Sequence, residues 1–209
     1  MLYYNTVNEL LKETLLTLMK AEVFRPFRLA GGTALSLQIG HRISVDIDLF
    51  SDAQYGSIDF DEIEHYLKSV FPYVDYLSNI NPAIGKSYTL GKNPDIAVKL
   101  DVFYTDSFIR ECVIEDEIRL TAMKLDVIQR GGRKKDFWDL HELLPQYSIT
   151  QMLMLHEQRY PYSHDKKLII KNFTEFASAD NDFDPVCLNG KYWEFIKADF
   201  EDAVQKFNL

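Results

Sequence analysis

The hydrophobic pattern at the start of the chain is helical. Leu11 and Leu15 recur four residues apart, and they follow Thr6 and Glu9, which have the spacing of a capping box. We therefore expect a first amphipathic helix that runs to about Lys20, with its apolar face in the core.

A strand, a glycine turn and a short helix are predicted next. Residues 27–30 are a short apolar strand candidate that ends at Gly31 and Gly32. Residues 33–39 then have a helical pattern that Gly40 closes. The glycine pair would form the turn between the strand and the helix.

Strict alternation follows in residues 45–50 (VDIDLF). Val45, Ile47 and Leu49 fall on one face of the predicted strand, and Asp46 and Asp48 fall on the other. This is the period of a half-buried strand whose polar face carries two carboxylates.

A second alternating strand carries one more aspartate. From residue 96 to 102 every second residue is apolar, so Asp101 points the other way, beside Lys99 and Phe103. The remaining expected elements of this part are a helix at 59–71 and strands at 73–77, 87–90, 96–104 and, at an edge, 112–114.

The rest of the chain has helical periodicity, and it indicates an α+β protein with a mixed front part and a helical back part. We place the division between residues 118 and 119, giving an α+β core at 1–118 and a helical C-terminal region at 119–209. The expected helices are 121–129, 134–144, 150–159, 165–177 and 191–207.

Composition narrows the class of protein. The chain has 209 residues with 46% hydrophobic and 26% charged residues, which is ordinary globular composition, and its net charge of -9 argues against a surface that binds nucleic acid throughout. A basic strip at 119–135 nevertheless suits a local phosphate or RNA contact, or is a solvated helix face. Two distant cysteines indicate neither a disulfide framework nor a zinc site, and without a visible signal peptide we expect a cytoplasmic protein.

The carboxylates of Asp46 and Asp48 are the strongest candidates for chemistry. Residues i and i+2 of a strand lie roughly 6 to 7 Å apart on one face, a spacing that can hold hard cations. The Asp-x-Asp pattern alone is weak, because it recurs at 59/61, 180/182 and 182/184. What distinguishes the first pair is a glycine turn that opens a helix, where backbone N–H groups can hold a phosphate, and a third strand carboxylate, Asp101. The alternative for Asp101 is an ordinary exposed strand residue.

Three acids and a phosphate-binding turn on adjacent strands are what metal-assisted phosphoryl or nucleotidyl transfer requires. Two Mg²⁺ ions would lower the pKa of an attacking hydroxyl and stabilise the departing pyrophosphate. Without a cation or solvent to relieve them, neighbouring carboxylates would raise one another's pKa.

Two segments carry a resemblance to a known family. LAGGTALSLQIGHRISVDIDLF (29–50) resembles the signature of the AbiEii/AbiGii toxin family of the nucleotidyltransferase superfamily, in which Gly-Gly or Gly-Ser precedes Asp-x-Asp, here across residues 33–45. TAMKLDVIQRGGRKKDFWDLHELL (121–144) resembles the downstream lysine and Lys-Asp-x-x-Asp motifs of that family. The resemblance covers about residues 25–145 and implies a nucleotidyltransferase-like mixed β-sheet with flanking helices.

The resemblance implies roles for individual residues. Asp46, Asp48 and Asp101 would be the metal ligands, with Asp101 alternatively a base toward the incoming hydroxyl. Gly31, Gly32 and Thr33 would form the turn beside the triphosphate. Lys124 would contact nucleotide phosphates, unless it is a surface lysine. Asp136 would complete the active site, or cap its helix and pair with Arg130.

Several other residues stay ambiguous. Arg42 could reach a phosphate with both guanidinium nitrogens, or pair with Asp46 or Asp48 in the metal-free protein. His141 is a distant candidate, and a packed or exposed histidine is the simpler interpretation. The acidic loop at 180–184 imitates the start of a calcium loop, but Pro185 stands where glycine is needed, so we reject that site.

The first hypothesis is a Mg²⁺-requiring, NTP-dependent nucleotidyltransferase, the toxin of a toxin–antitoxin or abortive-infection system. The resemblance implies transfer of nucleotides to an RNA 3′ end, with tRNA as acceptor, the basic strip against the RNA backbone, and an antitoxin encoded nearby. The alternatives are a nucleotidyltransferase that modifies a protein or small molecule, and a catalytically silent nucleotide-binding module. An aspartyl phosphatase fits poorly, because no upstream glycine turn is required there.

Overall fold

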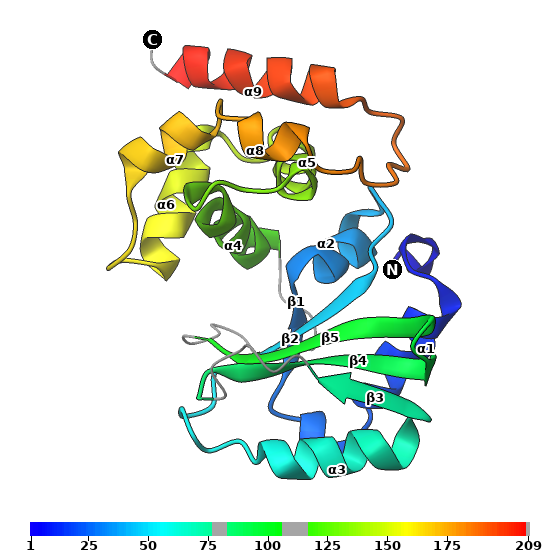
Figure 1. The fold of residues 1–209 in the computed structure, drawn as a ribbon. Coiled ribbons are helices and arrows are strands. Elements are labelled where there is room, and N and C mark those ends of the chain that lie inside the picture. Colours follow the sequence, from blue (N-terminus) through cyan, green and yellow to red (C-terminus); the bar gives the residue numbers. More distant parts are fainter. Residues whose placement is uncertain (77–82, 106–116, 208–209) are drawn as a thin grey trace. The chain divides into compact units, whose positions relative to one another are not determined.

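The computed structural model describes residues 1–76, 83–105 and 117–207 (Figure 1). It divides into two compact units. Residues 2–37 and 44–115 form the first, the sheet unit, and residues 1, 38–43 and 116–209 form the second, the helical unit. The predicted domain boundary at 118/119 adjoins residues 106–116, which lie outside the described residues, so it stays a prediction.

The sheet unit is built on a five-stranded mixed sheet, which confirms the predicted fold class. Strand order is β1-β2-β5-β4-β3, in which β2 and β5 are parallel and the other neighbours antiparallel. The predicted edge strand at 112–114 lies outside the described residues. The strands are β1 (Arg28–Ala30), β2 (Asp46–Ser51), β3 (Tyr73–Tyr76), β4 (Gly85–Asn93) and β5 (Ile96–Tyr104).

The register between β2 and β5 brings the predicted acids together. Asp48 is the ladder partner of Asp101, and Asp46 is the partner of Lys99. Paired residues of a parallel ladder point to the same side, so these four side chains share one face. The residues that alternate with them are wholly buried: Ile47, Leu49, Leu100 and Val102. Burial of these apolar side chains holds the register, because a slip by one residue would expose them.

Three α-helices of the described residues begin in the sheet unit: α1 (Glu9–Leu18), α2 (Gly31–Ile39) and α3 (Phe60–Val70). The expected cap of the first helix is wrong, because Asn8, not Thr6, accepts a hydrogen bond from a backbone N–H, that of Leu11. Asp59 caps α3 by accepting from the N–H groups of Asp61 and Glu62. In Figure 1, α3 lies along one face of the sheet.

In the helical unit α4 packs against α5, α6 and α7, and α9 packs on α5 and α6. The predicted helix at 165–177 is two helices, α7 and α8, because the chain turns between them and buries Phe173 and Phe176. Trp193 and Phe200 are buried, as expected for core residues. The helices are α4 (Glu117–Gln129), α5 (Lys134–Leu143), α6 (Ile149–Arg159), α7 (Lys166–Asn172), α8 (Ala177–Asp180) and α9 (Trp193–Phe207). Within the described residues, no helix combines the length and the apolar character needed to cross a membrane.

Candidate active site

The glycine turn and the aspartates of β2 touch each other. Gly31 has φ +66°, and a Cβ built on it would lie 2.2 Å from Oδ2 of Asp48. Any larger residue would therefore be strained and would also displace this carboxylate. The glycine at position 31 is explained by its close approach to the Asp48 carboxylate.

Thr33 fastens the turn to the beginning of β2. The side chain is buried, and its Oγ1 lies 2.8 Å from Oγ of Ser44 and within hydrogen-bond distance of the backbone oxygen of Asp46. In this arrangement Thr33 fixes where the acidic strand starts. Its predicted place beside a triphosphate, like that of Gly32, stays a prediction.

Two side chains from the sheet hold Asp101. Lys99 Nζ donates to Oδ2 of Asp101 at 2.5 Å, and the hydroxyl of Ser87 on β4 donates to Oδ1. The Asp101 side chain is 17% exposed and that of Lys99 43% exposed. Sequence alternation indicated Lys99 as a neighbour of Asp101, but neither Lys99 nor Ser87 was predicted as a functional residue. The only sequence signal for such a role was the position of Lys99, two residues before Asp101 and on the same face of the strand.

The acids also act on the charge of Lys99. Partial burial lowers the pKa of this ammonium, but its hydrogen bond to Asp101 and the charges of Asp101, Asp46 and Asp48 raise it above its ordinary value. Lys99 is thus a protonated counter-ion to the three carboxylates. We call Asp46, Asp48, Asp101 and Lys99 the acid face.

The chemistry of the acid face fits a hard divalent cation. Carboxylate oxygens are the ligands that Mg²⁺ prefers, and the backbone of Gly31 closely approaches the carboxylate of Asp48. Among the described residues, however, no three His, Cys, Asp or Glu side chains are grouped as metal ligands. Each oxygen of Asp101 accepts one hydrogen bond in this structure, Oδ1 from Ser87 and Oδ2 from Lys99.

The second predicted motif forms a buried ion cluster in the helical unit. Lys124 of α4 lies 2.6 Å from Oδ1 of Asp136 and 2.7 Å from Oδ2 of Asp139, both on α5. Arg42 binds Asp139 with two nitrogens, at 2.6 and 2.8 Å, and His41 Nε2 lies 2.6 Å from the same carboxylate. All five residues are buried.

The charges in the ion cluster stabilise one another. Burial raises the pKa of Asp139, but Arg42 and Lys124 outweigh burial and hold that pKa well below its ordinary range. Burial lowers the pKa of Lys124, and Asp136 and Asp139 reverse this, so the pKa is raised. Both groups are therefore ionised across the neutral range.

The ion cluster settles some alternatives left open by the sequence. Lys124 is not a surface lysine, because its side chain is 7% exposed. Asp136 caps α5 by accepting from the N–H of Arg133, but it pairs with Lys124, and Arg130 pairs with Asp126 instead. The bidentate partner of Arg42 in this structure is Asp139. Roles of Lys124, Asp136 and Arg42 toward a nucleotide stay predictions.

The basic strip is largely neutralised by acids of the helical unit. Lys134 is buried and lies 2.9 Å from Asp184, and Arg133 lies 3.4 Å from Asp182. The acidic loop at 180–184 therefore binds the beginning of α5, which gives it a role other than the rejected calcium site. His141 is hydrogen bonded to Asp199 and Lys191, as expected for a packed histidine.

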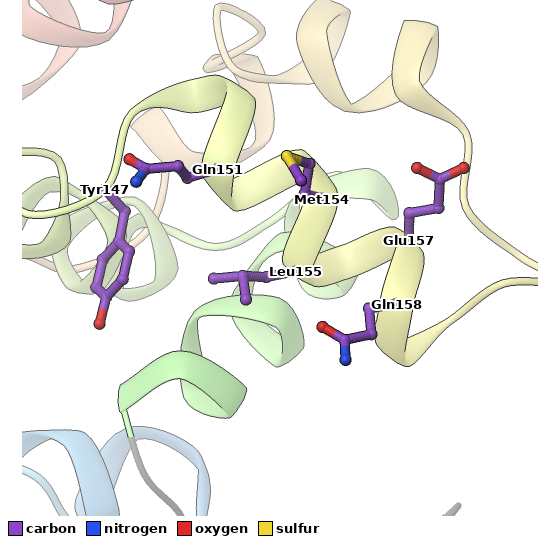
Figure 2. A pocket seen from close by; sticks show the side chains of 6 residues that line it. All are labelled: Tyr147, Gln151, Met154, Leu155, Glu157 and Gln158. Carbon is purple, nitrogen blue, oxygen red and sulfur yellow. The ribbon is translucent and has the colours of Figure 1, made fainter.

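One pocket of the helical unit lies on α6. It has a volume of about 470 Å³, and Figure 2 shows Tyr147 and five α6 side chains around it. Glu157 is the only carboxylate among its lining residues, which are Tyr147, Gln151, Met154, Leu155, Glu157 and Gln158. The pocket lacks a second acid or a base and carries no catalytic arrangement.

Known proteins match nearly the whole chain. A relative from Aquifex aeolicus (strain VF5), the uncharacterized protein aq_aa25, is 26% identical and covers 94% of this chain and 95% of its own. Two solved structures share the fold. JHP933 from Helicobacter pylori has a TM-score of 0.53 and 21% identity, covering 95% of this chain and 92% of its own.

The second structure is MenT4, the nucleotidyltransferase toxin Rv2826c from Mycobacterium tuberculosis H37Rv. It has a TM-score of 0.57 and 13% identity, and covers 93% of this chain and 82% of its own. A family model described as "Nucleotidyl transferase AbiEii toxin, Type IV TA system" matches residues 13–207, which include the acid face and the ion cluster. The chain therefore belongs to the AbiEii nucleotidyltransferase toxin family and is a nucleotidyltransferase.

Proposed function

We propose that this enzyme is a Mg²⁺-dependent toxin that transfers an NMP group from an NTP to the 3′ end of an RNA, with tRNA as the acceptor. The observation that carries the proposal is the acid face beside the glycine turn. Asp48 touches Gly31, and Asp46 and Asp101 share its side of the sheet. The cytoplasm, where NTPs and tRNA occur, is the proposed location, and an antitoxin encoded nearby is the proposed partner.

In the proposed reaction the acceptor hydroxyl forms a bond to the α-phosphorus, and the bond from that phosphorus to the bridging oxygen breaks, releasing pyrophosphate. Asp46, Asp48 and Asp101 would hold Mg²⁺, whose chemistry is to acidify the hydroxyl and offset charge on the phosphates. The hydroxyl proton passes to Asp101 if that residue acts as base. The N–H groups of the Gly31–Gly32 turn orient the triphosphate.

The family motifs extend the proposed site to Lys124 and Asp136. Lys124 would neutralise the departing pyrophosphate, and Arg42 would bind phosphate through its guanidinium. In the structure all three are members of the ion cluster, so Lys124 and Arg42 would each have to exchange a carboxylate contact for the nucleotide.

A protein or small-molecule acceptor is the second candidate. The observation that favours it is the neutralised basic strip: Arg130, Arg133 and Lys134 already pair with carboxylates. An RNA backbone would have to displace these acids before it met free positive charge.

One incubation tests both candidates. The purified protein receives Mg²⁺ and total bacterial RNA with each α-labelled NTP in turn, and Asp46→Ala is treated alongside. Label in a tRNA-sized band that the variant lacks supports the first candidate. Label in protein or in a small product, again dependent on Asp46, supports the second, and NTP binding without any transfer contradicts both.

A further inference from the structure

The ammonium of Lys99 contacts an oxygen of Asp101 that would bind a metal cation in the proposed site. It lies 2.5 Å from Oδ2 of Asp101, and the Lys99 backbone is the ladder partner of Asp46. The other oxygen of Asp101 accepts from Ser87. Each oxygen of Asp101 therefore already accepts one hydrogen bond while Lys99 is in place.

The charge balance of the acid face explains why an ammonium stands there. Asp48 and Asp101 are neighbours across a ladder, where strands are about 4.8 Å apart, and Asp46 is on the same side. Three carboxylates at such spacing repel one another, and Lys99 offsets part of this repulsion through its contact with Asp101. A divalent cation would do the same work at the same oxygens.

The Lys99 side chain can leave this position. It is 43% exposed, so its flexible four-carbon stem can swing the ammonium into solvent without a large desolvation change. Exposed ion pairs are worth only about 0–1 kcal/mol, which makes such an exchange accessible. Ser87, by contrast, is buried on β4 and stays with Asp101.

We propose that Lys99 is a positioning residue that competes with the divalent cation for Asp101, so that Asp101 becomes a ligand only when the ammonium is displaced. In this proposal Asp46 and Asp48 are metal ligands whether or not Lys99 is displaced, and Asp101 is a ligand only after Lys99 has left it. This inference rests on the proposed function, because it takes the acid face as the metal site.

The test measures Mn²⁺ binding without nucleotide, and the electron paramagnetic resonance signal of free Mn²⁺ reports the binding. Lys99→Met keeps the length of the side chain and removes its charge. We expect it to bind Mn²⁺ roughly ten-fold more tightly than the wild type, the scale of one charge interaction at a partly solvated site. A structural defect would weaken binding, so tighter binding distinguishes competition from damage.

Two variants serve as matched controls. Lys99→Arg retains the cation and should leave the Mn²⁺ affinity within about two-fold of the wild type, the variation expected of a partly exposed pair. Ser87→Ala removes the other partner of Asp101 without a change of charge and should not tighten binding. Equal tightening by Ser87→Ala, or unchanged or weaker binding by Lys99→Met, would overturn the proposed competition.

Thermal melting gives a second measurement. Without metal, Lys99→Met should melt at a lower temperature than the wild type, because Asp101 loses the ammonium that contacts it, and Mn²⁺ should raise its melting temperature by more. Asp48→Asn separates this inference from the proposed function. If Asp48→Asn abolishes Mn²⁺ binding but Lys99→Met binds as the wild type does, only the competition is wrong. If Asp48→Asn binds Mn²⁺ unchanged, the metal site itself is wrong.

Discussion

The acid face and the ion cluster both gather carboxylates and cations, but they balance charge differently. On the acid face three half-buried carboxylates lie on one side of the sheet, and one of them, Asp101, contacts the partly exposed Lys99. In the ion cluster two buried carboxylates bind a lysine, an arginine and a histidine, and Asp139 is wholly buried. Half-buried carboxylates beside a partly exposed lysine suit the exchange of ligands, whereas a balanced, buried network suits permanent structure.

The largest expected effect is on activity, at the acid face. Asp48→Ala should lower nucleotidyl transfer by on the order of 10³-fold, the scale seen when a charge-stabilising group is removed from an active site. Its melting temperature should stay at or above that of the wild type, because one of three repelling charges is gone. Transfer assays with labelled NTP check this.

The control for Asp48→Ala is Asp61→Ala, which changes an aspartate of another Asp-x-Asp triplet whose side chain is 97% exposed. It should transfer at the wild-type rate. A folded Asp48→Ala protein with full activity would remove Asp48 from the site.

The next effect is on stability, in the ion cluster. Asp139→Ala should lower the free energy of unfolding by about 3–5 kcal/mol, because it removes the buried carboxylate that Arg42 binds with two nitrogens and one of the two carboxylates that bind Lys124. Urea denaturation measures it. Asp199→Ala, which removes a 59% exposed carboxylate from His141, should cost less than about 1 kcal/mol. Similar losses in the two variants would show that the ion cluster is no stronger than a surface pair.

A comparison of Gly31 with Gly190 separates the effect of backbone strain from an effect on activity. Gly31 and Gly190 have φ values of +66° and +67°, but a Cβ at Gly31 would meet Asp48 and one at Gly190 would meet nothing within 4 Å. Each change to alanine should therefore cost about 1–3 kcal/mol of stability from backbone strain. Only Gly31→Ala should also lower transfer, by roughly 10²-fold. Equal activities in the two variants would contradict a functional contact between Gly31 and Asp48.

The pH dependence of stability tests the charge of Asp139 in the ion cluster. The lowered pKa of Asp139 means that its stabilisation is complete above its unfolded pKa, about 3.9, and is lost as pH falls toward the folded value. The stability gap between the wild type and Asp139→Asn should thus be constant from pH 5 to 8 and narrow below about pH 4. A gap that persists at lower pH would mean that the carboxylate charge is not what stabilises the cluster.

The smallest effect concerns the basic strip. Asp182→Asn removes the acid that pairs with Arg133, and should raise the affinity for tRNA by about two- to three-fold at low salt and less at high salt. Filter binding measures it. An affinity that does not respond would favour the second candidate acceptor.

The sequence predicted the acid face far better than the ion cluster. Strict alternation in β2 and β5 is a local signal, so the shared side of Asp46, Asp48 and Asp101 followed from the pattern and a parallel pairing. The hydrogen bond from His41 to Asp139 joins residues 98 positions apart. No local pattern reports such a pair, and so Arg42 was assigned to a phosphate or to the β2 acids.

Partner choice was harder to predict than secondary structure. The lysine motif was found, but whether Lys124 is exposed depends on how α4 and α5 pack. Likewise the acids at 180–184 were recognised as unsuited to calcium, but their pairing with Lys134 and Arg133 depends on the fold of the helical unit.

The placement of residues 38–43 in the helical unit has a consequence for synthesis on the ribosome. Arg42 and His41 emerge early, whereas Asp139, which binds them both, is made about a hundred residues later. At roughly 5–20 residues per second, the nascent chain carries these side chains without that carboxylate for some 5 to 20 seconds. The ion cluster can form only after α5 has been translated. The beginning of α2 belongs to the sheet unit, whereas residues 38–43 belong to the helical unit and lack their partner on α5 until then.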